Sequence, residues 1–398
     1  MSVSRADTSV LGRWWWTIDR WTLAALLALV GFGYLMMLAA SPAVAERIGA
    51  SSRNMFIIKQ VFYLALAAAV MVAVSLLPPK GVLRLALLGG LGALALTAAT
   101  LLMGTEIKGA RRWISLPGLS LQPSEFLKPC FAVVVAWLLA EGQRLAQLQA
   151  AAPNRGTALG RAVQRGFFPA VALGLFAIIA LLLKSQPDIG MLLVIAAVFL
   201  AQFFVAGLNL LIIGTLAGLA VAGGIGAYFT LPHVRSRVDR FLHPDAVTPG
   251  VADNHQTRTA EWAFGNGGLF GRGPGEGHLK NILPDAHADF VFAVAGEEFG
   301  LIVCMIILGL FAFVVVRGLL RLLAETDSFA MLAATGLLTQ FGLQAFINMA
   351  STLHLIPTKG MTLPFVSYGG SSVVAIALGM GMLLALTRRR LSRLEGLT

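Results

Sequence analysis

The sequence is poor in charged residues and in cysteine for its length. Only 12% of its 398 residues are charged, against about 25% in soluble domains, while 57% are hydrophobic and the mean hydropathy is +0.80. Charge this low, spread over long uncharged runs, excludes an ordinary soluble domain and indicates a polytopic membrane protein. The two cysteines, Cys130 and Cys304, lie in apolar segments, so we expect small core residues that carry no information about redox compartment.

Several motifs of soluble enzymes are also missing. The histidines lack HExxH-type spacing, which argues against a structural zinc site, and no GxSxG motif is present. The run GRGPGEG, residues 271–277, loosely matches a dinucleotide fingerprint but has no βαβ context. The net charge of +11 would suit nucleic acid, but the basic residues lie at the ends of apolar runs. We therefore interpret them as a membrane orientation signal and expect no nucleic-acid partner.

Apolar runs long enough to cross a bilayer divide the chain into about ten helices. The predicted fold class is therefore an all-α polytopic membrane protein. Because the number is even, both ends of the chain are expected on one side of the membrane. The runs lie at about 21–40, 55–77, 85–103, 126–139, 167–183, 189–206, 208–231, 290–316, 329–353 and 366–386.

The loops between these runs predict the orientation and the division of the chain. Basic residues are more frequent in the short loops that share a side with the N-terminus, which favours two cytoplasmic ends. We expect a cytoplasmic tail at 1–20, one transmembrane domain at 21–386 and a second cytoplasmic tail at 387–398. A large extracytoplasmic loop, about 232–287, falls between helices 7 and 8, and its glycine and aromatic content predicts a docked loop. No cleavable signal peptide is expected, because the first apolar run is long enough to span.

The stretch 281–300, NILPDAHADFVFAVAGEEFG, places acids and a histidine at the mouth of an apolar run, where they are costly and need a reason. Asp289 is the candidate catalytic carboxylate at the outer membrane interface, with His287 two residues away. The alternative is an ordinary helix-start aspartate that accepts backbone N–H groups. Glu297, about 12 Å further along a helix, is too distant for a direct partner but is able to orient a basic group.

A second polar group lies in the run KGARRWISLPGLSLQPSEFLK, which begins at Lys108. Arg112 and Trp113 precede Glu125 and Lys128, which lie one turn apart at the start of an apolar helix. An interfacial segment anchored by the tryptophan is the alternative. An acid and a base at this spacing predict an ion pair instead. The neighbouring basic groups suit a phosphate or pyrophosphate at the level of the lipid headgroups.

A third polar group is the run TKGMTLPFVSYGGSS, residues 358–372, which contains Lys359 and Ser367. Irregular backbone at membrane depth is tolerated only where it is buried in protein or lines a polar cavity. A simple re-entrant turn is the alternative. The run KSQPD, residues 184–188, adds another charged pair on the same side.

Taken in order, these motifs resemble the SEDS family of membrane glycosyltransferases: GARRWI with QPSEFLK, QPDIG, GGLFGRG with LPDAHADFVFAVAGEEFG, and PTKGMTLPFVSYGGSS. They occur in the family's order and cover residues 21–390. The last motif resembles the division-type member more than the elongation-type member. The resemblance implies a ten-helix inner-membrane enzyme that polymerises lipid II into glycan strands, here for the division septum. It also implies a class B penicillin-binding protein transpeptidase and other division proteins as partners.

The resemblance also implies site residues. The family's essential aspartate lies in an HTDF motif, which is matched here by His287-Ala288-Asp289-Phe290, so Ala288 removes the hydroxyl at that position. The family associates the positions of Trp113, Glu125 and Lys128 with activity or cavity structure. The full set of expected substrate-binding residues is Arg112, Trp113, Glu125, Lys128, His287, Lys359 and Ser367.

As a hypothesis, Asp289 acts as general base on the acceptor 4-hydroxyl, which attacks the donor's anomeric carbon and expels lipid pyrophosphate to form a β-1,4 bond with inversion. A helix N-terminus lowers the pKa of an aspartate, so metal binding or hydroxyl orientation by Asp289 are the alternatives. Leaving-group charge would be stabilised by Arg112, Lys128, Lys359 or a divalent cation such as Mg²⁺, and no other cofactor is implied. The rival functions are a lipid II flippase, the elongation-type polymerase and a scaffold for division proteins.

Overall fold

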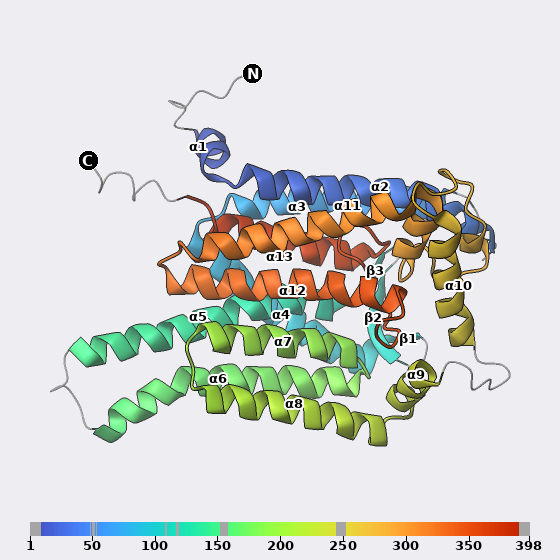
Figure 1. Cartoon of the computed structure of the whole chain (residues 1–398). Helices are drawn as coiled ribbons and strands as arrows, with labels where there is room; N and C mark the ends of the chain where they lie inside the picture. Colours follow the sequence, from blue (N-terminus) through green and yellow to red (C-terminus); the bar gives the residue numbers. More distant parts are fainter. Residues whose placement is uncertain are drawn as a thin grey trace.

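The computed structural model describes residues 9–47, 49, 52, 54–107, 110–116, 119–151, 158–243 and 252–389. Residues 1–8 of the expected tail at 1–20 and residues 390–398 of the expected tail at 387–398 lie outside this part of the chain. So do Lys108, which neighbours the predicted site, and residues 244–251 of the predicted loop. Figure 1 shows long helices that run side by side, with a small sheet and shorter helices at one end. The elements are α1 Val10–Thr17, α2 Arg20–Arg47, α3 Met55–Ser75, α4 Pro79–Met103, β1 Thr105–Ile107, β2 Ala110–Leu116, β3 Leu119–Leu121, α5 Pro123–Ala151, α6 Ala158–Ser185, α7 Ile189–Val205, α8 Leu210–Thr230, α9 Pro232–Leu242, α10 Ala252–Gly267, η1 Leu279–Asn281, α11 Val291–Leu322, α12 Ser328–Thr352 and α13 Gly370–Leu386.

Within the described residues, eight helices are long and apolar enough to cross a membrane, namely α2, α3, α4, α5, α6, α8, α11 and α12. Two further apolar helices, α7 and α13, have 17 residues each. At about 1.5 Å per residue such a helix is roughly 26 Å long, close to the ~30 Å of a hydrocarbon core. The all-α multi-pass membrane class is confirmed, while the number of ten spans stays a prediction.

A three-stranded antiparallel sheet, ordered β1-β2-β3, interrupts the helices and was missed by the all-α prediction. Ile114 of β2 lies opposite Leu121 of β3, and Glu106 of β1 lies opposite Arg111 of β2. The strands are only three to seven residues long. Runs this short and partly polar have no clear period of two, which explains why the sequence predicted only an outer loop here.

The interior of the bundle lies around α12, α13 and the first part of α5, residues 123–139, where most side chains are buried. α13 packs against α3 and α5, and α12 packs against α5 and α7. Cys130 on α5 and Cys304 on α11 are buried free thiols, as predicted. By contrast α8 has no buried residue and lies at the edge of the bundle in Figure 1. Polar side chains on α5 and α12 are therefore held inside protein rather than against lipid.

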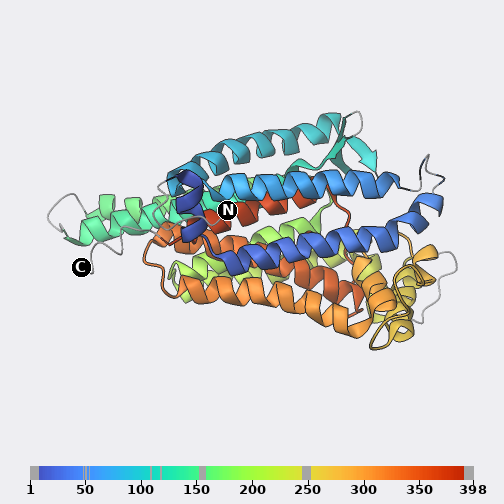
Figure 2. The same cartoon turned by 90° about the horizontal axis from the view of Figure 1, so that it is seen from above.

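The first and last described segments meet at one end of the bundle. The main-chain N–H of Arg389 donates to the carbonyl oxygen of Thr17 at 3.0 Å. Beside them Asp19, which is buried, accepts from Arg317 at 2.7 and 2.9 Å and lies 2.9 Å from Arg321. The sheet, α9 and α10 lie at the opposite end (Figures 1 and 2). This agrees with an even number of crossings, and the cytoplasmic location of the shared end stays a prediction.

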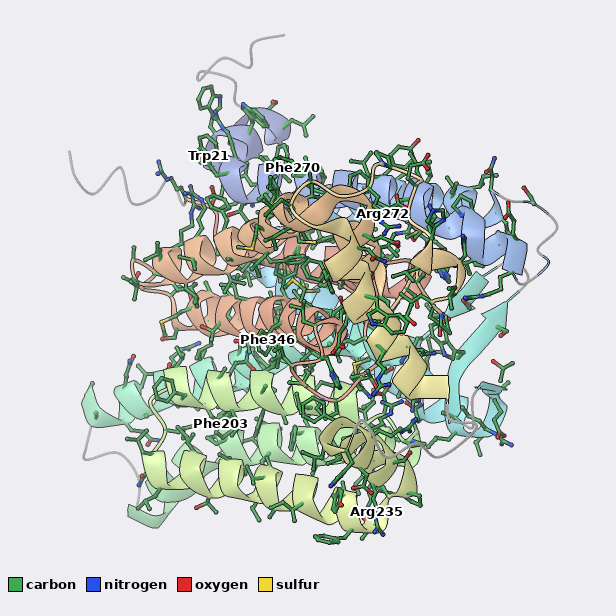
Figure 3. The ribbon with its side chains drawn as sticks, turned by 45° about the vertical axis from the view of Figure 1, so that its right-hand side comes forward. Trp21, Phe203, Arg235, Phe270, Arg272 and Phe346 are labelled. Atoms are coloured by element: carbon green, nitrogen blue, oxygen red, sulfur yellow. The ribbon has the colours of Figure 1, made fainter. Side chains whose placement is uncertain are left out.

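The long segment between α8 and α11 contains α9, α10 and η1, and two buried glutamates of α11 hold its glycine-rich part. Glu298 pairs with Lys280 at 2.6 Å and accepts the N–H of Gly275 at 2.9 Å. Glu297 accepts the N–H of His278 at 3.0 Å. Among the described residues Glu297 accepts main-chain N–H groups and Glu298 holds the lysine, so the orientation of a basic group by Glu297 stays a prediction. Phe270, labelled in Figure 3, is 80% exposed on this loop.

Candidate active site

Asp289 lies in a tight turn that leads into α11. The turn closes on Asp285, whose carbonyl oxygen accepts the N–H groups of Ala288 at 2.9 Å and Asp289 at 3.0 Å. Asp285 has a φ of 52°, a left-handed conformation that aspartate and asparagine tolerate better than most residues. The cap position of α11 falls on Phe290, one residue after Asp289. Asp289 is half-buried at the entrance to the helix, at the end of the bundle that carries the sheet.

The segment between α12 and α13, residues 353–369, lies directly against this turn. Ser367 donates through Oγ to the carbonyl oxygen of Ala288 at 2.6 Å and accepts the N–H of Leu363 at 2.9 Å. The N–H of Tyr368 donates to the carbonyl oxygen of His287 at 2.8 Å. Ser367 thus forms a hydrogen bond to the backbone of the turn that carries Asp289. Its role in binding substrate stays a prediction. Two runs that sequence analysis treated separately form one structure.

Gly360 marks the closest approach of the two segments. A Cβ atom built on Gly360 would lie 2.8 Å from Oδ2 of Asp289, which is closer than real Cβ contacts. The carboxylate of Asp289 therefore packs directly on the backbone of residue 360, beside Lys359. No side chain larger than hydrogen fits there without displacing the carboxylate.

His287 is held among aromatic rings. Its ring centroid lies 4.8 Å from that of Phe56 and 5.2 Å from that of Tyr368. Burial lowers the pKa of His287 to about 4, against the opposing effect of the Asp285 charge. Burial also raises the pKa of Tyr368 to about 12. Both side chains are therefore neutral at pH 7, so His287 offers no positive charge to a substrate there.

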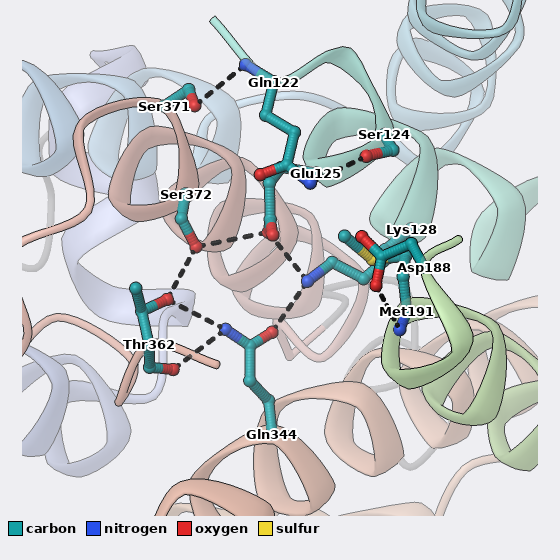
Figure 4. A network of polar contacts seen from close by, with 10 residues as sticks. All are labelled: Gln122, Ser124, Glu125, Lys128, Asp188, Met191, Gln344, Thr362, Ser371 and Ser372. Atoms are coloured by element: carbon teal, nitrogen blue, oxygen red, sulfur yellow. Dashed lines mark hydrogen bonds and ion pairs between the residues drawn. The ribbon is translucent and has the colours of Figure 1, made fainter. Parts of the chain in front are cut away.

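The predicted ion pair of Glu125 and Lys128 is confirmed, with Nζ 2.7 Å from Oε2. Lys128 also donates to Oε1 of Gln344 at 2.8 Å, and Gln344 donates through Nε2 to the carbonyl oxygen of Thr362 at 3.1 Å. The hydroxyl groups of Thr362 and Ser372 lie 3.0 Å apart, and Ser372 donates to Glu125 at 3.2 Å. Figure 4 shows this closed polar circuit, which joins α5 and α12 to the 353–369 segment and α13.

A second charged group, centred on Asp188, joins the sheet to the same segment. Lys359 lies 3.4 Å and Arg112 3.5 Å from the Asp188 carboxylate. Arg112 further donates to the carbonyl oxygens of Gln186 at 2.7 Å and Pro187 at 2.6 Å. Burial alone would raise the pKa of Asp188, but the charges of Lys359 and Arg112 outweigh it and lower the pKa. Burial likewise lowers the pKa of Lys359, partly offset by Asp188.

A family model described as a cell cycle protein matches residues 20–391 of this chain. The chain belongs to the FtsW/RodA/SpoVE family. It is 44% identical to the probable peptidoglycan glycosyltransferase FtsW of Caulobacter vibrioides, over 97% of this chain and 93% of that protein. It is 37% identical to the probable peptidoglycan glycosyltransferase FtsW of Alkalilimnicola ehrlichii, over 96% and 92%. The resemblance drawn from the motifs is confirmed.

Two solved structures have the same fold as this chain. A chain from a structure of a peptidoglycan synthase complex, described as coordinating polymerization and crosslinking, aligns with a TM-score of 0.72 and 26% identity. That alignment covers 93% of this chain and 97% of the other. RodA of Thermus thermophilus aligns with a TM-score of 0.62 and 25% identity, over 94% and 97%. The bundle described above is therefore the fold of the family.

The structure brings most of the predicted site residues of this FtsW-like chain to one end of the bundle. The 353–369 segment connects them. It contacts the Asp289 turn, the Glu125 circuit and Asp188. Trp113 lies on β2 next to Arg112, and its carbonyl oxygen accepts from the hydroxyl of Thr105 at 3.2 Å. A role of Trp113 in the site stays a prediction.

Sequence analysis missed the amide side chains of α12. Gln340, Gln344 and Asn348 are all buried and recur every fourth residue, which places them on one face of the helix. A polar stripe of this kind in an apolar helix is costly unless it faces partners inside the bundle. That spacing is the signal that would have identified α12 as a wall of the site.

Among the residues that the structure describes, no three His, Cys, Asp or Glu side chains form a group able to hold a metal ion. A magnesium ion bound by one carboxylate and the phosphates of a substrate would not need such a group. The divalent cation of the sequence hypothesis therefore stays a prediction, with Asp289 as the carboxylate that would contribute.

Proposed function

We propose that this chain is a peptidoglycan glycosyltransferase that polymerises lipid II into β-1,4 glycan strands at the outer face of the inner membrane. Its proposed setting is septal wall synthesis during cell division. Support comes from the relatives named probable peptidoglycan glycosyltransferase FtsW, to which the chain is more similar than to the RodA structure. The elongation-type role is the weaker alternative for the same reason.

One observation supports the enzymatic role most directly. The carboxylate of Asp289 lies against Gly360, in a segment that also carries Lys359 and is tied to the buried Glu125 and Lys128 pair. An acid and cations gathered at the end of an apolar bundle suit a sugar carried on a pyrophosphate-linked lipid. A group meant only to cap a helix would not need these neighbours.

The proposed chemistry is a single displacement. Asp289 takes the proton of the acceptor 4-hydroxyl as that oxygen forms a bond to the anomeric carbon of the donor. The bond from this carbon to the pyrophosphate oxygen breaks, and lipid pyrophosphate leaves with the electron pair, so the configuration inverts. A general base contributes about 10²–10⁴-fold, so charge stabilisation of the leaving group must supply much of the rest.

Lys359 is the best suited of the predicted cations to that second task. Lys128 is buried inside the polar circuit, and Arg112 already donates to two carbonyl oxygens of the chain. The Lys359 side chain is 21% exposed, has its carboxylate partner 3.4 Å away and adjoins the residue that contacts Asp289. It therefore retains donor capacity for a pyrophosphate oxygen.

The proposed setting in the cell follows the family. A class B penicillin-binding protein would supply the transpeptidase, and other division proteins would complete the assembly; the similar chain in a peptidoglycan synthase complex supports the first of these. We propose cytoplasmic segments at 1–20 and 387–398, one membrane domain at 21–386 and an extracytoplasmic loop at about 232–287. The meeting of Thr17 and Arg389 at one end supports the shared side.

The function is tested with the full chain in vesicles, alone and with a class B penicillin-binding protein, using labelled lipid II. Wild type should form glycan polymer and Asp289→Asn should form none. Glu141→Gln is the control, because the Glu141 carboxylate pairs with Arg144 at 3.4 Å beyond the buried part of α5, and it should leave polymerisation intact. Movement of label across the bilayer without polymer would support the flippase instead. Neither activity in wild type would support the scaffold.

A further inference from the structure

Asn348, on the inward face of α12, connects the two segments of the site. It is fully buried, and its Nδ2 donates to the carbonyl oxygen of Asp289 at 3.0 Å and to that of Met361 at 2.6 Å. Met361 follows Gly360, the residue on which the Asp289 carboxylate packs. One amide group therefore binds the peptide of the aspartate and the peptide beside its contact surface.

The orientation of this amide follows from its neighbours. Both groups within reach of Nδ2 are carbonyl oxygens, which accept hydrogen bonds and do not donate them. Exchanging the amide oxygen and nitrogen would place the oxygen against two acceptors. The NH₂ group has two hydrogens. It donates one to the carbonyl oxygen of Asp289 and the other to that of Met361.

The attachment is also rigid on the side of the helix. Asn348 belongs to the continuous helix α12, which packs against α5 and α7 in the interior of the bundle. The segments it binds are irregular backbone, and such backbone depends on external partners to hold one conformation. A single side chain, that of Asn348, therefore fixes the position of Asp289 relative to α12.

We propose that Asn348 is a positioning residue that fixes the Asp289 carboxylate relative to Gly360 and Lys359 for glycosyl transfer. This inference rests on the proposed role of Asp289 as general base. Displacement of a reacting group by about 1 Å costs on the order of 10²-fold in rate. Loss of the two hydrogen bonds should therefore reduce turnover much more than it reduces substrate binding.

Gln202 on α7 provides a matched control within the same bundle. It is also fully buried, and its Nε2 donates to two main-chain carbonyl oxygens, that of Ala132 at 2.6 Å and that of Leu332 at 3.1 Å. Those carbonyls belong to α5 and α12, not to the segments around Asp289. An amide lost at Gln202 thus removes the same kind of bond without touching the site.

The first measurement compares Asn348→Leu with Gln202→Met, two apolar replacements of similar shape. We expect both variants to lose thermal stability, but only Asn348→Leu to lose kcat, by about 10²-fold with a KM for lipid II within about threefold of wild type. Equal kcat in the two variants would overturn the positioning role. In single-turnover measurements, where a slow residual rate of Asp289→Asn is resolved, adding Asn348→Leu to that variant should lower the rate no further.

The second measurement uses Asn348→Asp and does not depend on the leucine variant folding. A protonated aspartic acid donates one hydrogen bond to a carbonyl oxygen, whereas the carboxylate repels both oxygens. The kcat of this variant relative to wild type should therefore fall as pH rises and the new carboxyl group ionises. A kcat equal to that of wild type at every pH between 5 and 8 would contradict the inference, because neither form of the aspartate donates to both carbonyl oxygens.

The two proposals fail in different ways. If Asp289→Asn polymerises lipid II normally, the general base is wrong and positioning by Asn348 falls with it. If Asp289→Asn is inactive while Asn348→Leu matches Gln202→Met, only the positioning role is wrong.

Discussion

The ammonium nitrogen of Lys128 lies 2.7 Å from Oε2 of Glu125, one turn earlier on α5, and both side chains are buried. The contact is extended by Gln344 and Ser372 into the circuit that reaches Thr362. Lys128 donates to Gln344, Gln344 donates to Thr362, and Ser372, whose hydroxyl contacts that of Thr362, donates to Glu125. The pair therefore connects the interior of the bundle to the segment that lies against Asp289.

Charge reversal tests whether this pair acts as a unit. Glu125→Lys or Lys128→Glu leaves two like charges buried side by side, and breaking a buried pair costs about 3–5 kcal/mol. We expect each single variant to lose polymerisation and the double variant to recover more activity than either. Activity and melting temperature are measured on the same preparations. No recovery in the double variant would argue against a direct pair.

Gly360→Ala tests the packing of the Asp289 carboxylate. The new methyl group would lie 2.8 Å from Oδ2, so the carboxylate has to move by several tenths of an ångström or more. We expect kcat to fall by about 10²-fold with little change in stability. Gly309→Ala on α11, where the added methyl meets nothing within 4 Å, is the control. Equal turnover in the two variants would show that a methyl group at position 360 does not displace the Asp289 carboxylate from its working position.

Lys359→Gln tests stabilisation of the leaving group. Removal of one donor that stabilises developing charge costs about 10²–10³-fold in kcat in enzymes that depend on it. We expect a loss of that size. Lys184→Gln is the control, because Lys184 lies exposed at the end of α6, and it should retain full activity. If Lys359→Gln turns over lipid II at the rate of the control, Lys359 does not stabilise the charge of the leaving group.

The stability of the protein should fall in acid because of His287. Its pKa in the folded chain is about 4, below the usual histidine value of 6.5, so the unfolded chain binds more protons between these values. Stability therefore rises with pH through this window, and its loss by pH 4 is on the order of 3 kcal/mol. We expect His287→Phe, which keeps an aromatic ring beside Phe56 and Tyr368, to have a melting temperature less sensitive to pH between 4 and 6.5. An unchanged pH dependence would exclude His287 as the cause.

Local patterns made part of this architecture predictable. Long apolar runs predicted the helices, and the spacing of Glu125 and Lys128 predicted their contact because one helix holds both. The predicted ends of helices were less accurate where polar residues extend a helix. The fourth apolar run was predicted at 126–139, whereas α5 extends from Pro123 to Ala151.

Contacts between distant parts of the chain were not predictable in the same way. Asp188 meets Arg112 and Lys359 only because the sheet, the start of α7 and the 353–369 segment converge, and no single run contains that information. Asn348 was missed because an asparagine in an apolar helix looks unremarkable alone. Its meaning depends on the two carbonyl oxygens that α12 brings within reach.

The central claim is that one carboxylate performs the proton transfer of glycan polymerisation. Its most direct test is the single-turnover rate of glycosyl transfer by purified Asp289→Asn with bound lipid II, against Glu141→Gln. The account predicts a rate at least about 10²-fold below that of the control, with substrate binding retained. Glycan strands formed at the control's rate would contradict it.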